Sequence, residues 1–207
     1  MTSNATVLLP ENLSYYKSQL SLEGDNYTDK HQRKFNRGEM IPLWSGIIWK
    51  IEKGIFRSLT WSEEGTLITL GIWGPGDIIG RALSKIEPYQ IESLSRSEVS
   101  ILPANFIHQT SHAILEQIQL AQELLCIIRR ERVHISLLEL LIWLAKRFGQ
   151  EIEEGHLLDL PMTHQELAEV IGTTRVTITR LFKQFEDEGI IKRHRRQLIL
   201  CYPVNKT

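Results

Sequence analysis

Residues 163–185 read THQELAEVIGTTRVTITRLFKQF, and this pattern predicts two short helices joined by a turn. Thr163 and Glu166 fit a capping box, in which each side chain satisfies a free backbone N–H at a helix start. Gly172 tolerates the turn because it carries no Cβ, and Thr173 can cap the second helix. Two capped helices around a glycine-containing turn form the pattern of a helix-turn-helix.

The second predicted helix has one apolar face and one polar face. Its apolar side chains recur with the period of an amphipathic helix: Ile178, Leu181, Phe182 and Phe185. The opposite face carries Val176, Thr179, Arg180 and Lys183. A basic, hydroxyl-rich outer face is typical of a recognition helix that enters the major groove of DNA. The alternative is a pair of packed surface helices with a solvated charged face, since isolated matches to this motif also arise by chance.

The residues after the second helix predict a hairpin with a basic tip. Residues 186–189 end the helix, and their glycine fits a C-cap. Residues 190–192 and 197–202 have strand character on either side of the basic run Arg-His-Arg-Arg at 193–196. From Gly172 onward there are eight Lys or Arg against three acidic residues, although the whole chain carries a net charge of −1. Basic charge concentrated beside a recognition helix favours binding to a phosphate backbone, as in a winged helix-turn-helix.

Residues 159–182 resemble the DNA-binding motif of the Crp/Fnr transcription regulators. Within that family, the run TRVTITRL at 174–181 is most similar to the cyanobacterial global nitrogen regulator. Together with the sensor region described next, the resemblance covers most of residues 35–202. It implies a homodimeric transcription regulator that binds double-stranded DNA, with RNA polymerase as a candidate partner.

Residues 34–103 change to short apolar or alternating runs separated by glycines, which predicts an all-β region. Four runs have strand character: residues 47–51, 55–59, 66–70 and 99–102. The set Phe35, Gly38, Gly54, Gly65, Gly76 and Gly80 resembles the sensor barrel of the same family. We therefore expect an α+β fold whose N-terminal part is a β-barrel or jelly roll, similar to a cyclic-nucleotide-binding domain.

From about residue 104 the apolar pattern becomes helical. A seam with coiled-coil spacing predicts a dimer interface formed by Ile114, Ile118, Ala121, Leu125 and Ile128. A second apolar edge could rest on the sensor barrel: Leu120, Leu124 and Ile127. A helix that packs only within its own chain is the alternative.

The remaining segments complete the predicted domain plan. Residues 129–132 form a polar break suited to a hinge, and residues 136–148 are apolar enough for a core helix. An acidic loop at 149–155 and a short strand at 156–160 then lead into the helix-turn-helix. The expected divisions are a sensor-like domain (1–108), a dimerisation helix (109–135) and a winged helix-turn-helix domain (136–207).

The candidate effector pocket departs from the pattern of cyclic-nucleotide-binding relatives. Those relatives follow the last glycine of the barrel set with Glu and place Arg-Ser/Thr-Ala several residues later. Here Arg81 follows Gly80, and residues 82–102 contain no such triplet. We therefore expect a regulator that does not depend on a cyclic nucleotide, and the effector stays open. The Arg81 guanidinium is solvated, paired within the chain or directed at an anion.

The sequence predicts neither a cofactor nor an enzyme. An iron–sulfur cluster needs about four thiolates, and the N-terminal region contains no cysteine. His108 and His112 are four residues apart and could bind a divalent metal on a helix, but two surface histidines are the commoner outcome, so we expect no metal. No nucleophile elbow, Walker loop or paired-carboxylate motif is present in the sequence.

Cysteine use and hydropathy favour a cytoplasmic protein without a membrane partner. Cys126 and Cys201 lie far apart and lack a CxxC partner, which is typical of a reducing compartment. No apolar run approaches the length of a membrane span, and the N-terminus lacks the pattern of a signal peptide.

Base and phosphate contacts are expected from separate sets of residues. Periodicity places Val176 and Arg180 away from the core, and the resemblance implies base reading at Arg175, Val176 and Arg180. We expect phosphate contacts from Thr173, Thr177, Thr179, Lys183, Lys192, Arg193, Arg195 and Arg196. The expected site resembles GTA and TAC half-sites separated by about eight base pairs. The alternative function is a small-molecule or metal sensor whose C-terminal domain contacts a protein partner.

Overall fold

The computed structural model describes residues 32–44, 46–102, 111–159, 162–194 and 197–201. His108, Arg195 and Arg196 lie outside these residues, so the predictions made for them are not addressed by the structure. Residues 33–207 belong to one structural unit.

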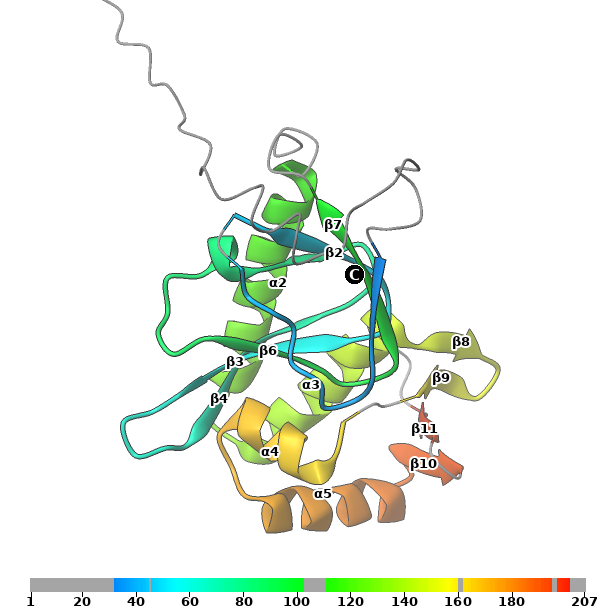
Figure 1. Ribbon diagram of the computed structural model, residues 1–207. Coiled ribbons are helices and arrows are strands. Elements are labelled where there is room, and N and C mark those ends of the chain that lie inside the picture. The colour runs from blue at the N-terminus through cyan, green and yellow to red at the C-terminus, as the bar shows by residue number, and fades with distance from the viewer. Residues whose placement is uncertain (1–31, 45, 103–110, 160–161, 195–196, 202–207) are drawn as a thin grey trace, which may run out of the picture. The chain divides into compact units, whose positions relative to one another are not determined.

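Two antiparallel sheets form the sensor-like part of the chain (Figure 1). The first sheet has the order β1 (Gln32–Phe35), β7 (Ser97–Leu102), β2 (Ile48–Lys53) and β5 (Ile78–Ile79). The second has the order β4 (Leu67–Trp73), β3 (Phe56–Trp61) and β6 (Gln90–Ser93), and a short 3-10 helix, η1 (Arg81–Leu83), follows β5. The α+β fold expected from the sequence is confirmed, with a sensor-like part built from two sheets; among the described residues these sheets do not close into a barrel.

The two sheets bury a common core between them. Side chains from both sheets form one cluster: Trp49, Ile51, Phe56, Trp73, Ile79, Ile91 and Val99. Strand β3 is unusual because Phe56 and the next four residues are all buried. Successive side chains of a strand point to opposite faces. Because Phe56 joins the core between the sheets, Arg57 lies on the other face, where helices of the C-terminal part cover it.

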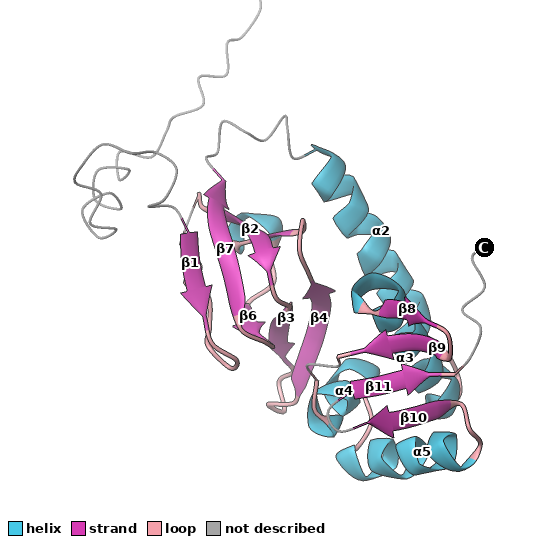
Figure 2. Ribbon diagram, turned by 90° about the vertical axis from the view of Figure 1, so that its right-hand side faces the viewer, coloured by secondary structure: helices cyan, strands magenta, loops and turns pink. Residues whose placement is uncertain are grey.

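In the described part of the chain after the sensor sheets there are four helices: α2 (Ser111–Ile128), α3 (Val133–Phe148), α4 (His164–Ile171) and α5 (Arg175–Asp187). A third sheet completes this part, in the order β10 (Ile191–His194), β11 (Gln197–Leu200), β9 (Gly155–Leu158) and β8 (Gln150–Ile152). Figure 2 shows these four strands side by side, with α5 beyond β10. The prediction of an acidic loop at 149–155 is wrong. Residues 150–152 pair with 155–157 as a hairpin, and Glu153 and Glu154 form its turn.

The C-terminal core includes side chains from the sensor sheets. Leu137, Leu141, Leu167, Phe182 and other buried side chains of α3, α4 and α5 share one cluster with Ile72 of β4 and Leu94 after β6. Helix α2 contributes to the same cluster the apolar edge that was predicted to rest on the barrel. Leu124 and Ile127 are members of the cluster, and Leu120 packs against it. The two parts of residues 33–207 are therefore joined through apolar packing.

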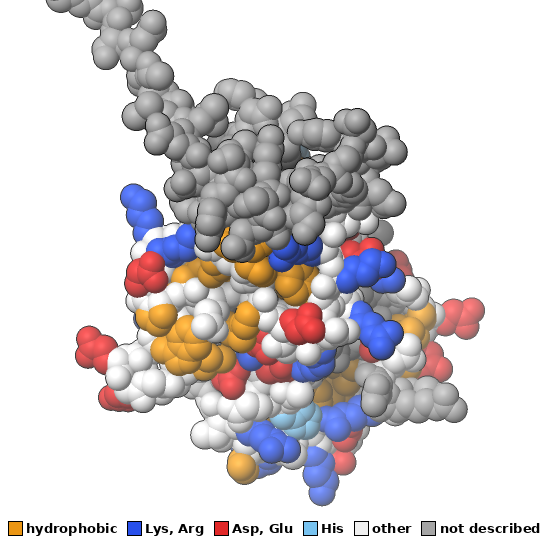
Figure 3. All heavy atoms as spheres, viewed as in Figure 1, with side chains coloured by type: hydrophobic (Ala, Val, Ile, Leu, Met, Phe, Trp, Pro, Cys, Tyr) orange, Lys and Arg blue, Asp and Glu red, His pale blue; other side chains and the backbone are white. Residues whose placement is uncertain are grey.

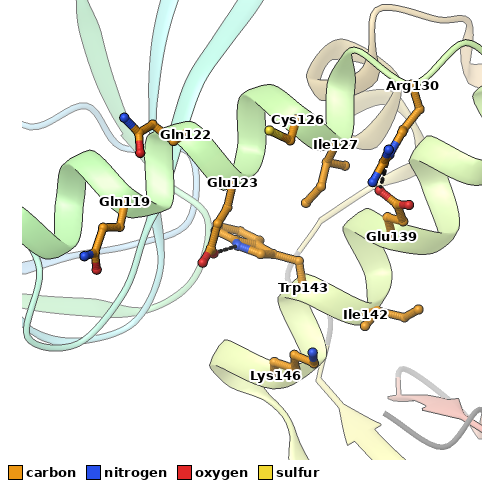
Figure 4. A pocket seen from close by; sticks show the side chains of 10 residues that line it. All are labelled: Gln119, Gln122, Glu123, Cys126, Ile127, Arg130, Glu139, Ile142, Trp143 and Lys146. Atoms are coloured by element: carbon orange, nitrogen blue, oxygen red, sulfur yellow. Dashed lines mark hydrogen bonds and ion pairs between the residues drawn. The ribbon is translucent and has the colours of Figure 1, made fainter. Parts of the chain in front are cut away.

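The polar segment predicted as a hinge separates α2 from α3. Helix α2 ends at Ile128 and α3 begins at Val133. Two side-chain hydrogen bonds connect the end of α2 and the residues after it to α3, beside an open groove of about 590 Å³ (Figure 4). The Trp143 Nε1 donates to a Glu123 carboxylate oxygen at 2.7 Å, and the Arg130 Nε donates to Glu139 at 2.8 Å. None of the described helices is long and apolar enough to cross a membrane.

Candidate nucleic-acid interface

Helix α4 begins with the predicted capping box. The Thr163 hydroxyl accepts a hydrogen bond from the Glu166 backbone N–H at 3.2 Å, and the Glu166 carboxylate accepts one from the Thr163 N–H at 2.5 Å. These bonds satisfy two backbone donors that a helix start otherwise leaves free. Leu167, Ala168 and Val170 then bury one face of the helix in the C-terminal core. The start of α4 is thereby fixed relative to α5.

The turn between α4 and α5 differs by one residue from the prediction. Gly172 adopts the left-handed conformation (φ 76°, ψ 43°), which a residue without Cβ reaches at little cost. Thr173 lies after the C-cap and helps to close the end of α4, because its N–H bonds the Ala168 carbonyl oxygen at 2.9 Å. Thr174 is therefore the N-cap of α5, and its hydroxyl accepts from the Thr177 N–H at 3.2 Å.

Helix α5 has the two faces that its sequence predicts. Ile178, Leu181, Phe182 and Phe185 are buried. The side chains exposed on this helix include Arg175, Val176, Thr179, Arg180 and Lys183. Val176 is 78% exposed, which is high for an apolar side chain. In Figure 3 basic side chains gather at the bottom of the view, where α5 lies in Figure 1. The three residues expected to read bases thus share one uncovered surface.

The threonines of α5 do not all face outward. The Thr177 side chain is half-buried, and its hydroxyl lies 2.9 Å from that of Thr174. Thr179 is exposed and donates to the Arg175 carbonyl oxygen at 2.9 Å. Phosphate contact stays a prediction for Thr173, Thr177 and Thr179, of which only Thr179 is exposed.

His164, the first residue of α4, contacts both α5 and the hairpin of β10 and β11. These contacts were not predicted from the sequence. Its ring stacks on Phe182 with centroids 4.6 Å apart, and its Nδ1 lies 2.9 Å from the Thr179 hydroxyl. Its Nε2 lies 3.0 Å from a guanidinium nitrogen of Arg193. Burial and then the charges of Arg193 and Arg175 lower the pKa of His164, while Glu186 opposes the shift. A lone histidine after an N-cap carries no sequence signal for such a contact.

Arg193 lies within strand β10, not at the hairpin tip where it was expected. Its guanidinium is 4.8 Å from the centre of the Phe182 ring, and its Nε is 2.8 Å from a Glu186 oxygen. Lys192 is exposed and pairs with Glu154 at 3.2 Å, which raises the pKa of Lys192. These contacts connect the β10–β11 hairpin to α5 and to the β8–β9 turn.

The residues predicted for a dimer seam on α2 differ in exposure within the single chain. Ile118 and Leu125 are 51% and 55% exposed, and Ala121 is also exposed. Ile114 and Ile128 are half-buried, and Ile128 packs on the core of its own chain. Leu115, which was not among the residues predicted for the seam, is 61% exposed. The exposed stripe therefore includes Leu115, Ile118 and Leu125, with three- and seven-residue spacings that fit one side of a helix.

Arg81 is paired within its own loop. Its guanidinium donates to the carbonyl oxygens of Ser84 and Ile86 at 3.0 Å each and forms an ion pair with Glu87. A cavity of about 390 Å³ lies nearby, and its lining is mainly apolar, with Ser58, Ser84, Tyr89 and Gln117 as polar exceptions. Arg81 is not among the residues that line this cavity. Internal pairing is thus the arrangement that the structure gives for this side chain.

The described residues bring no three His, Cys, Asp or Glu side chains together as a metal site. His112 lies 3.3 Å from Glu116, one helical turn away, and both side chains are exposed. Cys126 is exposed and Cys201 is half-buried, and both are free thiols.

Known proteins resemble this chain in both sequence and fold. Residues 131–203 match the model of the Crp-like helix-turn-helix domain. The regulatory protein CysR of Synechococcus elongatus is 43% identical over 178 residues, which cover 84% of this chain and 85% of that protein. A global nitrogen regulator of Nostoc is 37% identical over 68 residues, covering 33% of this chain and 30% of the relative.

Solved structures extend the likeness to the sensor part. A CRP-family transcriptional regulator from Thermus thermophilus superposes with a TM-score of 0.70 at 22% identity, covering 82% of this chain and 92% of that one. A cyclic nucleotide-binding domain containing protein from Listeria monocytogenes gives a TM-score of 0.71 at 19% identity, covering 92% and 98%. At this identity the likeness concerns the fold alone. The length and identity of the CysR match, together with the helix-turn-helix match, place the chain in the Crp/Fnr family of DNA-binding transcription regulators.

Proposed function

We propose that this regulator acts as a homodimer that reads a palindromic DNA site and needs no cyclic nucleotide to do so. The observation that carries the proposal is the outer face of α5, where Arg175, Val176 and Arg180 are all exposed. Burial of the opposite face fixes the direction of these side chains. A recognition helix positioned in this way can enter a major groove without rearranging its own core.

Arg175, Val176 and Arg180 supply complementary chemistry for base reading. A guanidinium can bond both O6 and N7 of guanine, and each such pair discriminates against a wrong base by about 1–3 kcal/mol. Val176 offers only apolar surface, which suits the methyl group of thymine. These preferences support half-sites of the GTA and TAC type. Lys183, Lys192 and Arg193, with the other residues expected at phosphates, would set the register along the backbone.

The exposed stripe on α2 supports a two-fold dimer. Leu115, Ile118 and Leu125 leave apolar surface in water that a second copy of α2 can cover. A two-fold axis along this helix would present two recognition helices to successive major grooves, roughly 34–36 Å apart. We expect the two half-sites to be separated by about eight base pairs for the same geometric reason.

Independence from cyclic nucleotides is supported by the surroundings of Arg81. A bound phosphate needs donors that are not already engaged, because an anion must exchange its water for equally good hydrogen bonds. Arg81 already bonds two carbonyl oxygens and the Glu87 carboxylate. The mainly apolar cavity beside it does not include this guanidinium.

Selection of binding sites from random duplex DNA, with protein purified without added ligand, tests the proposal. We expect a GTA–TAC palindrome with a spacer of about eight base pairs. Repeating the selection with Arg180→Ala should weaken the preference for one base in each half-site, with a loss of about 1–3 kcal/mol in binding free energy. Lys183→Ala is the matched control on the same face, and it should keep the consensus while lowering the salt slope by roughly one unit. Failure to recover a palindrome would overturn the proposal.

A further inference from the structure

Among the residues that the structure describes, three ion pairs connect the sensor sheets to α3 and α4, the helices that pack beside α5. Arg57 of β3 pairs with Glu169 of α4, Arg37 after β1 pairs with Glu166 of α4, and Asp77 before β5 pairs with Arg147 of α3. We infer that Arg57 is a positioning residue for DNA recognition, which holds α4, and through it the reading helix, in one orientation on the sensor sheets. The inference rests on the proposed function, because it concerns affinity for the palindromic site.

Arg57 is almost fully buried, at 6% exposed, and its guanidinium lies between two carboxylates. Glu92 belongs to the sensor sheet and accepts from Arg57 at 2.7–2.8 Å, whereas Glu169 belongs to α4 and accepts at 2.7 Å. Burial alone would lower the pKa of Arg57, but the bonds to Glu169 and Glu92 outweigh burial and raise it. A buried guanidinium needs such partners, since an unpaired buried charge is strongly unfavourable. Arg57 therefore favours the orientation in which Glu169 reaches it.

Arg37 reinforces this attachment one turn earlier on α4. One guanidinium nitrogen of Arg37 lies 2.7 Å from each Glu166 carboxylate oxygen, and the other donates to the Leu94 carbonyl oxygen. Glu166 is also the capping-box residue of α4. The same carboxylate thus fixes the start of α4 and binds it to the sensor sheets.

The third connection brings α3 close to the sensor backbone. Arg147 bonds Asp77 at 2.6 Å and the Ile72 carbonyl oxygen at 2.8 Å. A Cβ placed at Gly74 would lie 2.3 Å from a ring carbon of Phe148, so the two parts approach as closely as a glycine allows. Polar and apolar contacts therefore agree on one arrangement of the two parts.

This arrangement leaves the DNA-reading surface open. Helix α4 lies between β4 and α5 (Figure 1), and Glu166 and Glu169 contact the sensor side. Arg175, Val176 and Arg180 on α5 remain exposed in the same arrangement. The ion pairs thus hold the reading helix without covering it. A fixed orientation lowers the conformational entropy lost when two helices enter adjacent grooves, so the ion pairs should strengthen specific binding.

Glu169→Gln and Glu92→Gln form a matched pair of variants for testing this role. Each replaces one of the two carboxylates that pair with the Arg57 guanidinium by a neutral amide, and each leaves Arg57 paired with the other carboxylate. Only Glu169→Gln removes the charge that Arg57 pairs with on α4, and the Arg37–Glu166 pair remains in both variants. Glu166 is unsuitable for this purpose, because its loss would also remove the capping box.

Affinity of the full-length variants for the selected palindrome is the measurement. We expect Glu169→Gln to weaken binding about 3–30-fold and Glu92→Gln to change it less than about two-fold. The slope of log affinity against log salt should be unchanged in both variants, because neither carboxylate is among the expected phosphate contacts. An Arg57→Met, Glu169→Gln double variant should bind no more weakly than Arg57→Met alone, as expected for residues that act together.

The outcomes separate the inference from the proposed function. Wild-type protein that binds the palindrome while Glu169→Gln binds equally well overturns the positioning role. Tighter binding by Glu169→Gln also overturns it, and would mean that the connection opposes DNA binding. Equal weakening by Glu92→Gln and Glu169→Gln would assign the effect to the sensor core instead of the connection. Wild-type protein that binds no duplex overturns the proposed function itself.

Discussion

At the scale of single residues, His164 of α4 contacts the helix that we propose reads DNA and the strand that follows it. Its ring lies on Phe182, and its two nitrogens face Thr179 and Arg193. A neutral ring suits this position, because a protonated ring would face the Arg193 guanidinium. The lowered pKa of His164 expresses the same preference.

This preference for the neutral ring predicts that the free energy of unfolding decreases in mildly acidic solution. Above the ordinary histidine pKa of 6.5, His164 is neutral in both the folded and the unfolded chain and contributes no pH dependence. Below that value the unfolded chain takes the proton first, so the free energy of unfolding decreases until the folded pKa is passed. Urea unfolding between pH 7.5 and 5.5 should show a smaller loss for His164→Gln than for wild type. Identical losses would show that His164 is not responsible.

At the scale of elements, α2 packs one apolar face against its own chain and exposes another to solvent. Leu124 and Ile127 are buried in the C-terminal core, while Ile118 and Leu125 are exposed. The sequence predicted both faces, because helical periodicity is a local pattern. Ile114 and Ile128 of the predicted seam are half-buried within their own chain, because exposure along two adjacent apolar edges depends on where the rest of the chain packs.

Ile118→Glu should separate the dimer without unfolding the monomer. Its side chain is half exposed in one chain, so the substitution should change the free energy of unfolding of the monomer by about 0.5 kcal/mol or less. Two carboxylates at a dimer seam should weaken association at least about 30-fold. Sedimentation equilibrium measures this directly. Gln119→Glu is the control, because it adds the same charge at a flanking position where coiled coils commonly carry charge. An Ile118→Glu protein that remains dimeric would exclude this seam.

The helix-turn-helix was predictable in detail because its signals lie close together in sequence. The capping box and the apolar stripe of α5 both depend on neighbours three or four residues away. The N-cap of α5 was misplaced by one residue, because both Thr173 and Thr174 have a suitable hydroxyl. The strand before the helix-turn-helix was predicted, but its partner β8 was read as an acidic loop because two glutamates occupy the turn.

At the scale of the whole molecule, the contacts that join the two parts could not be read from the sequence. Arg57 and Glu169 are 112 positions apart, and Arg37 and Glu166 are 129 apart. A charged residue in a strand is normally assigned to the solvent face. Arg57 departs from that expectation only because α4 covers it after folding. Glu166 was identified as a cap, and its second role depends on the same long-range packing.

The central claim is that two copies of the chain present paired recognition helices to one face of the duplex. The most direct test is the affinity of the ligand-free protein for duplexes that carry GTA and TAC half-sites with spacers of six to ten base pairs. Changing the spacer by two base pairs rotates one half-site by roughly 70° relative to the other, since a turn contains 10–10.5 base pairs. The account predicts tightest binding at eight base pairs, with two chains on each duplex. Equal affinity at every spacing, or a single chain on each duplex, would contradict it.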